Sequence, residues 1–135
     1  MSSGDNEWAT PGVAGMPRLI LRFEGLALLS AAAFGYHSQH GNWVLFAVLF
    51  LAPDLSMVGY LVSPLFGAIC YNVAHTTLLF GMLAGIGYLT NHDVITQIGL
   101  IGLAHVGFDR AAGYGLKYPE GFGFTHLGRI GKEAN

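Results

Sequence analysis

Residues 65–89 read LFGAICYNVAHTTLLFGMLAGIGYL, a run that contains no Asp, Glu, Lys or Arg. A helix that crosses a membrane needs about 20 mainly apolar residues, so this run is long enough to cross one. Three further segments share its apolar character, namely Leu19–Tyr36, Trp43–Val62 and Val94–Phe108. The sequence therefore predicts an all-α, polytopic membrane protein that folds as a bundle of four transmembrane helices.

The composition favours a membrane protein over a soluble domain. Hydrophobic residues make up 53% of the 135 residues and charged residues only 10%, whereas a soluble domain usually carries about a quarter charged residues. The formal net charge is -2, which provides no basic excess for binding nucleic acid. We therefore expect the lipid bilayer as the main partner, and no nucleic acid.

The basic residues indicate how the bundle is oriented. Two stand at the start of the first apolar segment and four follow the last, while the connections 37–42 and 90–93 contain none. Positive residues favour the cytoplasmic side of a membrane. The pattern predicts an even number of spans, in a multi-pass protein of the inner (plasma) membrane with both termini in the cytoplasm.

The chain divides into three regions on this interpretation. Residues 1–17 are polar and contain Ser, Gly and Pro, so we expect a flexible cytoplasmic tail. Residues 18–110 are expected to form the four-helix transmembrane domain. Residues 111–135 begin with alternating glycine, aromatic and basic residues, which predicts an interfacial C-terminal segment on the cytoplasmic side.

Several polar residues fall inside the apolar segments, where an unpaired polar group is costly. Pro53 is expected to break the second segment and direct Asp54 inward, because proline removes a backbone donor. Residues three or four positions apart share a helical face, and the depths of the polar groups place them between the bilayer midplane and the cytoplasmic face. The sequence thus predicts one ligand or proton site, formed by Glu24, Asp54, Asn72, His75, His105, Asp109 and Arg110.

Carboxylates and imidazoles in such a set are ligands for divalent metal ions. The candidate metal ligands are Glu24, Asp54, His75, His105 and His126. Two other interpretations stay open. The polar residues would also suit a proton-coupled small transporter that acts as a homodimer, or a structural subunit of a larger membrane complex in which they only fix helix packing. Whether the protein is an enzyme is left open as well.

Three motifs resemble a family of small bacterial integral membrane proteins known as a domain of unknown function. They are PDLSMVGYL at 53–61, YNVAH at 71–75 and AHVGFDRAAGYGLKYPEGFGFTHLG at 104–128. The resemblance covers nearly all of the chain from Arg22 to Gly131. It implies a compact multi-spanning fold in a bacterial membrane, and it brings no activity, substrate or cofactor.

A second resemblance concerns fewer residues. The Pro53–Asp54 pair, Arg110 and the Thr125–His126 pair are similar to a motif of membrane-bound metal-dependent hydrolases. Arg110 and His126 stand much farther apart here than in the compact motif of that family. What this resemblance implies is limited to a metal site that includes Asp54 and His126.

Overall fold

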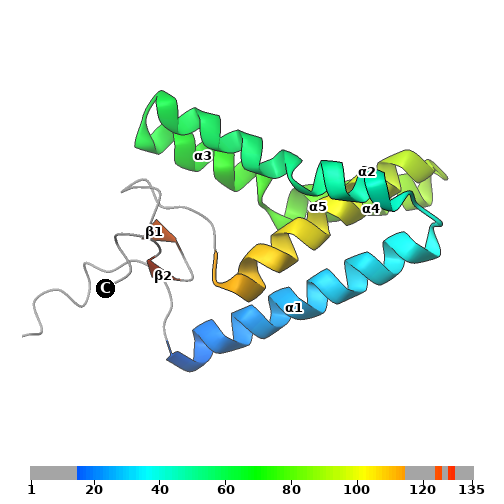
Figure 1. Cartoon of the computed structure of the whole chain (residues 1–135), viewed down its shortest axis with the longest axis horizontal. Coiled ribbons are helices and arrows are strands. Elements are labelled where there is room, and N and C mark those ends of the chain that lie inside the picture. The colour runs from blue at the N-terminus through cyan, green and yellow to red at the C-terminus, as the bar shows by residue number, and fades with distance from the viewer. Residues whose placement is uncertain (1–14, 115–123, 126–127, 130–135) are drawn as a thin grey trace, which may run out of the picture.

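The computed structural model describes residues 15–114, 124–125 and 128–129. This part of the chain is almost entirely helical, as the sequence predicts (Figure 1). Two short strands pair antiparallel with each other. The elements in chain order are α1 (Gly15–Ser38), α2 (Trp43–Phe50), the 3-10 helix η2 (Ala52–Leu61), α3 (Pro64–Ala74), α4 (Thr77–Leu89), α5 (Asp93–Ala112), β1 (Phe124–Thr125) and β2 (Gly128–Arg129).

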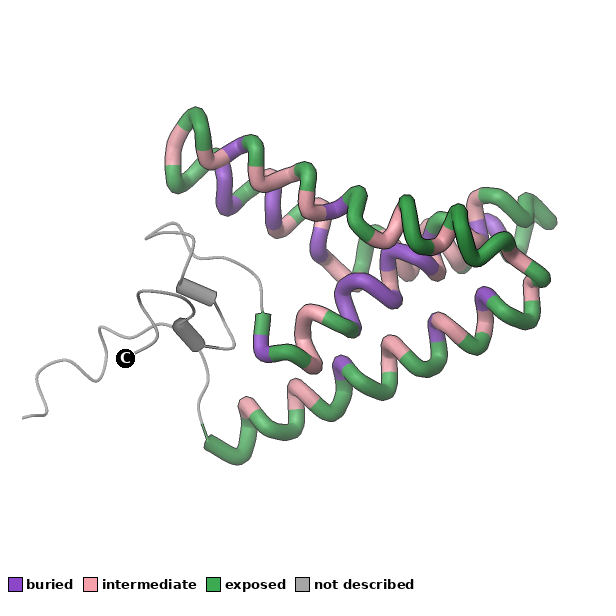
Figure 2. The backbone as a smooth tube through the Cα atoms, in the orientation of Figure 1, coloured by how far each residue is buried: buried purple, intermediate pink, exposed green. Residues whose placement is uncertain are grey.

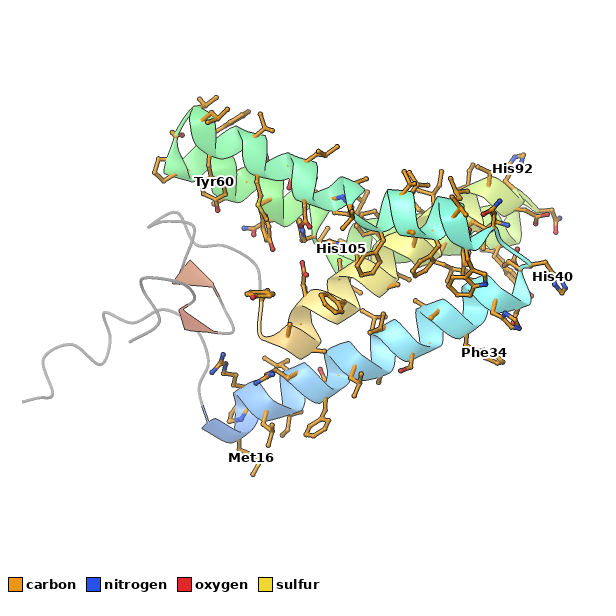
Figure 3. All side chains as sticks on the ribbon, viewed as in Figure 1. Met16, Phe34, His40, Tyr60, His92 and His105 are labelled. Atoms are coloured by element: carbon orange, nitrogen blue, oxygen red, sulfur yellow. The ribbon has the colours of Figure 1, made fainter. Side chains whose placement is uncertain are left out.

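The helices run back and forth in four alternating passes, formed by α1, by α2 with η2, by α3 with α4, and by α5 (Figure 1). His40 and His92 mark the α1–α2 and α4–α5 turns, which lie at the same end of the molecule (Figure 3). The start of α1 and the end of α5 lie together at the opposite end. The passes therefore alternate in direction as the four apolar segments predict.

Polar residues at the turns define where the helices begin. Asn42, Ser63 and Thr76 each accept a backbone N–H with a side-chain oxygen at the start of α2, α3 and α4, respectively. These caps satisfy donors that have no partner within the helix. Gly113 ends α5 in the left-handed conformation, with φ of 94°, which glycine adopts without a steric penalty.

Three helical segments of the described chain are long and apolar enough to cross a membrane, namely Gly15–Ser38, Trp43–Leu61 and Pro64–Leu89. Large apolar side chains are exposed along all three, which fits contact with lipid chains. Met16 and Phe34, for example, point away from the other helices (Figure 3). The prediction of helices that could cross a membrane is thus confirmed for three of the four expected segments.

The fourth expected span, α5, is not among these three segments. Its position explains its more polar sequence. It packs against α1, α4 and α2, and it has more buried residues than any other helix of the described chain (Figure 2). Thr96 and His105 are among its buried residues. A helix that is surrounded by protein can carry polar and small residues that a lipid-facing helix cannot.

Two of the apolar segments contain a break. The break expected at Pro53 is present, because α2 ends at Phe50 and the chain continues as a 3-10 helix. Segment 65–89 differs from the expected single helix, because α3 ends at Ala74 and Thr76 caps a new helix, α4. Long 3-10 stretches are uncommon and often mark a functional site or a strained sequence. The two breaks place Asp54 and His75 at helix ends.

Glycines bring α1 and α5 into direct backbone contact. A Cβ atom added at Gly107 would lie 2.6 Å from the Leu29 nitrogen and 2.7 Å from the Gly25 carbonyl oxygen. A Cβ atom added at Gly25 would lie 2.6 Å from the Arg110 Cβ. Because Cβ atoms do not come this close to other atoms, larger residues at these positions would separate the helices. The contact fixes the half of α5 that carries His105 and Asp109.

Candidate metal centre

Four side chains from three elements converge where the two passes are broken. Asp54 comes from the start of η2 and His75 from the residue that ends α3. His105 and Asp109 stand four residues apart on α5 and share one face of it. One ligand atom from each of the four lies within 4.8 Å of the other three. Figure 3 shows His105 near the middle of the helical part of the molecule.

The distances within this cluster fall in a narrow range. The two Nε2 atoms of His75 and His105 are 3.1 Å apart. Asp54 Oδ1 lies 3.2 Å from the Nε2 atom of His75 and 3.3 Å from that of His105. Asp109 Oδ2 lies 3.5 Å and 3.2 Å from the same two atoms. Ligands placed 2.0–2.1 Å from a tetrahedral ion are separated by roughly 3.3 Å. These five distances therefore fit one ion, and the sixth, between the two carboxylates, is within 4.8 Å.

A hydrogen bond outside the cluster orients His75. Its Nδ1 donates to the Tyr71 carbonyl oxygen at 2.8 Å, and the Tyr71 ring stacks on the imidazole with centroids 3.7 Å apart. Because a carbonyl oxygen can only accept, Nδ1 carries a proton, and the neutral form of the ring then has its Nε2 lone pair free for a metal ion. Metal-binding histidines are commonly held in this way.

The cluster places two carboxylates beside two buried histidines. The His75 and His105 side chains are only 3% and 2% exposed, and that of Asp109 is 14% exposed. Within the described ranges, no Lys or Arg forms an ion pair with either carboxylate. A buried charge is costly unless it is paired. A divalent ion would neutralise the two carboxylates.

Asp54 is the accessible member of the cluster, with 40% of its side chain exposed. The ring of Phe50, at the end of α2, contacts the His105 ring with centroids 5.0 Å apart. The Tyr71 ring stacks on the His75 ring. Each of the two histidines is thus packed against an aromatic side chain. A water molecule or substrate would approach the cluster from the side of Asp54.

The other residues that the sequence predicts for the site have different surroundings. Glu24 is exposed on α1 and lines a separate pocket of about 170 Å³ together with Arg110. Asn72 is half-buried on α3, three residues before His75. His126 lies outside the described residues. The structure therefore brings Asp54, His75, His105 and Asp109 together and leaves Glu24 apart.

The sequence predicts Asp109 for the ligand site, and its spacing from His105 is the signal that joins them. One contribution is missed. Tyr71 is not predicted at all. Its spacing of four residues from His75 in the motif YNVAH is the signal that could have revealed its contact with the imidazole.

Comparison with known families covers most of the chain. Residues 18–130 match the model of a family described as a domain of unknown function, DUF4260. The chain belongs to this family. The match includes both helix breaks and all four cluster residues, and it confirms that the sequence motifs belong to a domain-of-unknown-function family. No curated protein and no solved structure matches this DUF4260 member.

Proposed function

We propose that this DUF4260 member is a membrane protein that binds one divalent transition-metal ion at Asp54, His75, His105 and Asp109. The observation that carries the proposal is the set of five ligand-to-ligand distances between 3.1 and 3.5 Å, close to the roughly 3.3 Å of a tetrahedral site. Imidazole and carboxylate ligands suit Zn²⁺, Mn²⁺, Fe²⁺ and Co²⁺.

The proposal includes α5 as a fourth membrane span. Its 20 residues correspond to about 30 Å of helix, which matches the hydrocarbon thickness of a bilayer. Arg22, near the start of α1, donates to the Ala111 carbonyl oxygen at the end of α5 at 2.9 Å. The start of α1 and the end of α5 therefore lie on the same side of the membrane. The arginines there favour the cytoplasmic face of the inner membrane.

A divalent ion at this position supplies Lewis-acid chemistry, because it polarises a carbonyl or phosphoryl oxygen and lowers the pKa of a bound water. The four side chains of the cluster hold the ion, and the Tyr71 carbonyl fixes the tautomer of His75. Aromatic rings limit the access of water to the histidines. Asp54 lies at the open side, where a substrate oxygen would enter.

Metal analysis of the purified full-length protein tests this proposal. We expect about one ion per chain in the wild type, and a loss of bound metal in His75→Ala and in His105→Ala. His92→Ala is the matched control, since His92 is exposed in the α4–α5 turn and should keep the metal. A wild-type protein that retains no metal, and that Zn²⁺, Mn²⁺ or Fe²⁺ does not stabilise against heat, would refute the proposal.

A second candidate function is proton transfer in a small transporter that works as a homodimer. It is favoured by the 3.1 Å between the two Nε2 atoms, which also fits an N–H···N hydrogen bond that carries a shared proton. Proton uptake into vesicles that contain the protein distinguishes the two functions. Uptake that is independent of added metal and lost in Asp54→Asn would favour the transporter.

The accessory-subunit interpretation makes a third, different prediction. If the cluster only fixes helix packing, His105→Ala should lower thermal stability while the wild type shows neither bound metal nor proton uptake. A larger membrane complex would then be recovered by gentle purification. The same two measurements, metal content and proton uptake, therefore separate all three interpretations.

A further inference from the structure

An apolar cleft of about 590 Å³ lies beside the candidate metal centre. Side chains from five helices, α2, η2, α3, α4 and α5, form its walls, and none of them carries a charge or a side-chain oxygen. Its size falls in the range of about 300–1,000 Å³ that is typical of ligand pockets. It is larger than the pockets of about 200 Å³ and 170 Å³ that α1 lines.

The cleft and the metal centre meet on three elements. Pro53 lines the cleft and directly precedes Asp54, and Ala74 lines it and directly precedes His75. Ile101, also on the wall, stands four residues before His105 on the same face of α5. The two helix breaks that direct the ligands into the cluster therefore also open the cleft next to it.

The cleft is bordered by residues that are exposed on the membrane-spanning segments. Ile69, Val73 and Leu79 line it and are exposed, and all three lie in the segment Pro64–Leu89, which is long and apolar enough to cross a membrane. Lipid chains are the molecules at such a surface. A polar ligand would lose its hydration there without gaining a hydrogen bond from the wall.

We infer that the cleft binds the hydrocarbon chain of a lipid whose polar head group reaches the metal centre from the side of Asp54. The inference rests on the proposed metal-binding function, and it names the ligand class of that centre. The ligand is amphipathic, with a long apolar chain and an oxygen-bearing head group that can coordinate a divalent ion. It enters laterally from the bilayer.

Photocrosslinking in a reconstituted membrane tests this inference. The full-length protein is placed in phosphatidylcholine vesicles with a trace of a long-chain fatty acid that carries a diazirine in mid-chain. After illumination, the labelled peptides are mapped by mass spectrometry. We expect labelling of residues 69–74 to exceed labelling of residues 55–62 by about tenfold. This ratio corresponds to a tenfold higher affinity of the fatty-acid chain for the cleft than for the surface of η2.

Val73→Trp fills the cleft, and Val58→Trp is its matched control. Val73 and Val58 are 58% and 62% exposed, and Val58, on η2, does not line the cleft. Val73→Trp should remove the excess labelling, whereas Val58→Trp should retain it, and both variants should keep the metal content of the wild type. Ile69→Trp has the same expected effect as Val73→Trp and decides the question if that variant fails to fold.

Labelling that is no stronger at 69–74 than at 55–62, or that neither tryptophan in the cleft reduces, would overturn the inference. Metal content is measured on the same samples, so the two proposals fail separately. Bound metal without excess labelling removes the lipid ligand and retains the metal centre. Excess labelling without bound metal refutes the link between the lipid and a metal centre.

Discussion

Replacement of Gly107 by alanine should push α1 and α5 apart. The added Cβ atom would lie 2.6 Å from the Leu29 nitrogen, about 0.8 Å below the 3.4 Å at which ordinary contact begins. Its other close neighbour, the Gly25 carbonyl oxygen, is also a main-chain atom that cannot rotate away. Overpacking of this kind costs about 1–3 kcal/mol. Alanine's higher helix propensity offsets about 1 kcal/mol of that cost.

Gly85→Ala provides the matched control for Gly107→Ala. Gly85 lies in α4, and no atom lies within 4 Å of an added Cβ, so this variant has the propensity gain without the clash. Gly107→Ala should therefore have a free energy of unfolding about 1–3 kcal/mol below that of Gly85→Ala. Circular dichroism in mixed detergent micelles measures the difference. Equal stabilities would show that α1 and α5 do not touch at Gly107.

Three further substitutions test other parts of the account. Asn42→Ala removes the cap of α2 and should cost about 1 kcal/mol in the same unfolding assay, with unchanged metal content; full stability would argue against the cap. Pro53→Ala restores a backbone donor and should let α2 continue, which moves Asp54 and weakens metal affinity by about 10–100-fold in a competition titration with a chelating dye; unchanged affinity would show that proline does not impose the break. Glu24→Gln should bind metal like the wild type, because Glu24 is exposed and outside the cluster; a loss of affinity would return Glu24 to the ligand set.

Sequence alone predicts the helical class and the break at Pro53, because hydropathy and proline act through local physics. It does not predict the break after His75. No proline or glycine marks that position, and a threonine such as Thr76 is compatible with both a helix interior and an N-cap. The break therefore depends on packing between elements, which periodicity within one segment does not report.

The candidate site is predicted in part for a related reason. Depth along a helix places Asp54, His75 and His105 in one layer, but it does not specify the face of the helix on which a residue lies. Successive residues on a helix are about 100° apart. Because Gly25 faces α5, the neighbouring Glu24 turns toward the surface. The tertiary contact of α1 with α5 thus removes Glu24 from the ligand set.

X-ray absorption of the purified protein loaded with Zn²⁺ tests the metal centre most directly. The structure predicts a first shell of nitrogen and oxygen atoms at roughly 2.0–2.1 Å, together with the outer-shell scattering of two imidazole rings from His75 and His105. His105→Ala should lose one of the two imidazole contributions or all bound zinc. A protein that binds no zinc, or zinc without imidazole scattering, would contradict the proposed centre.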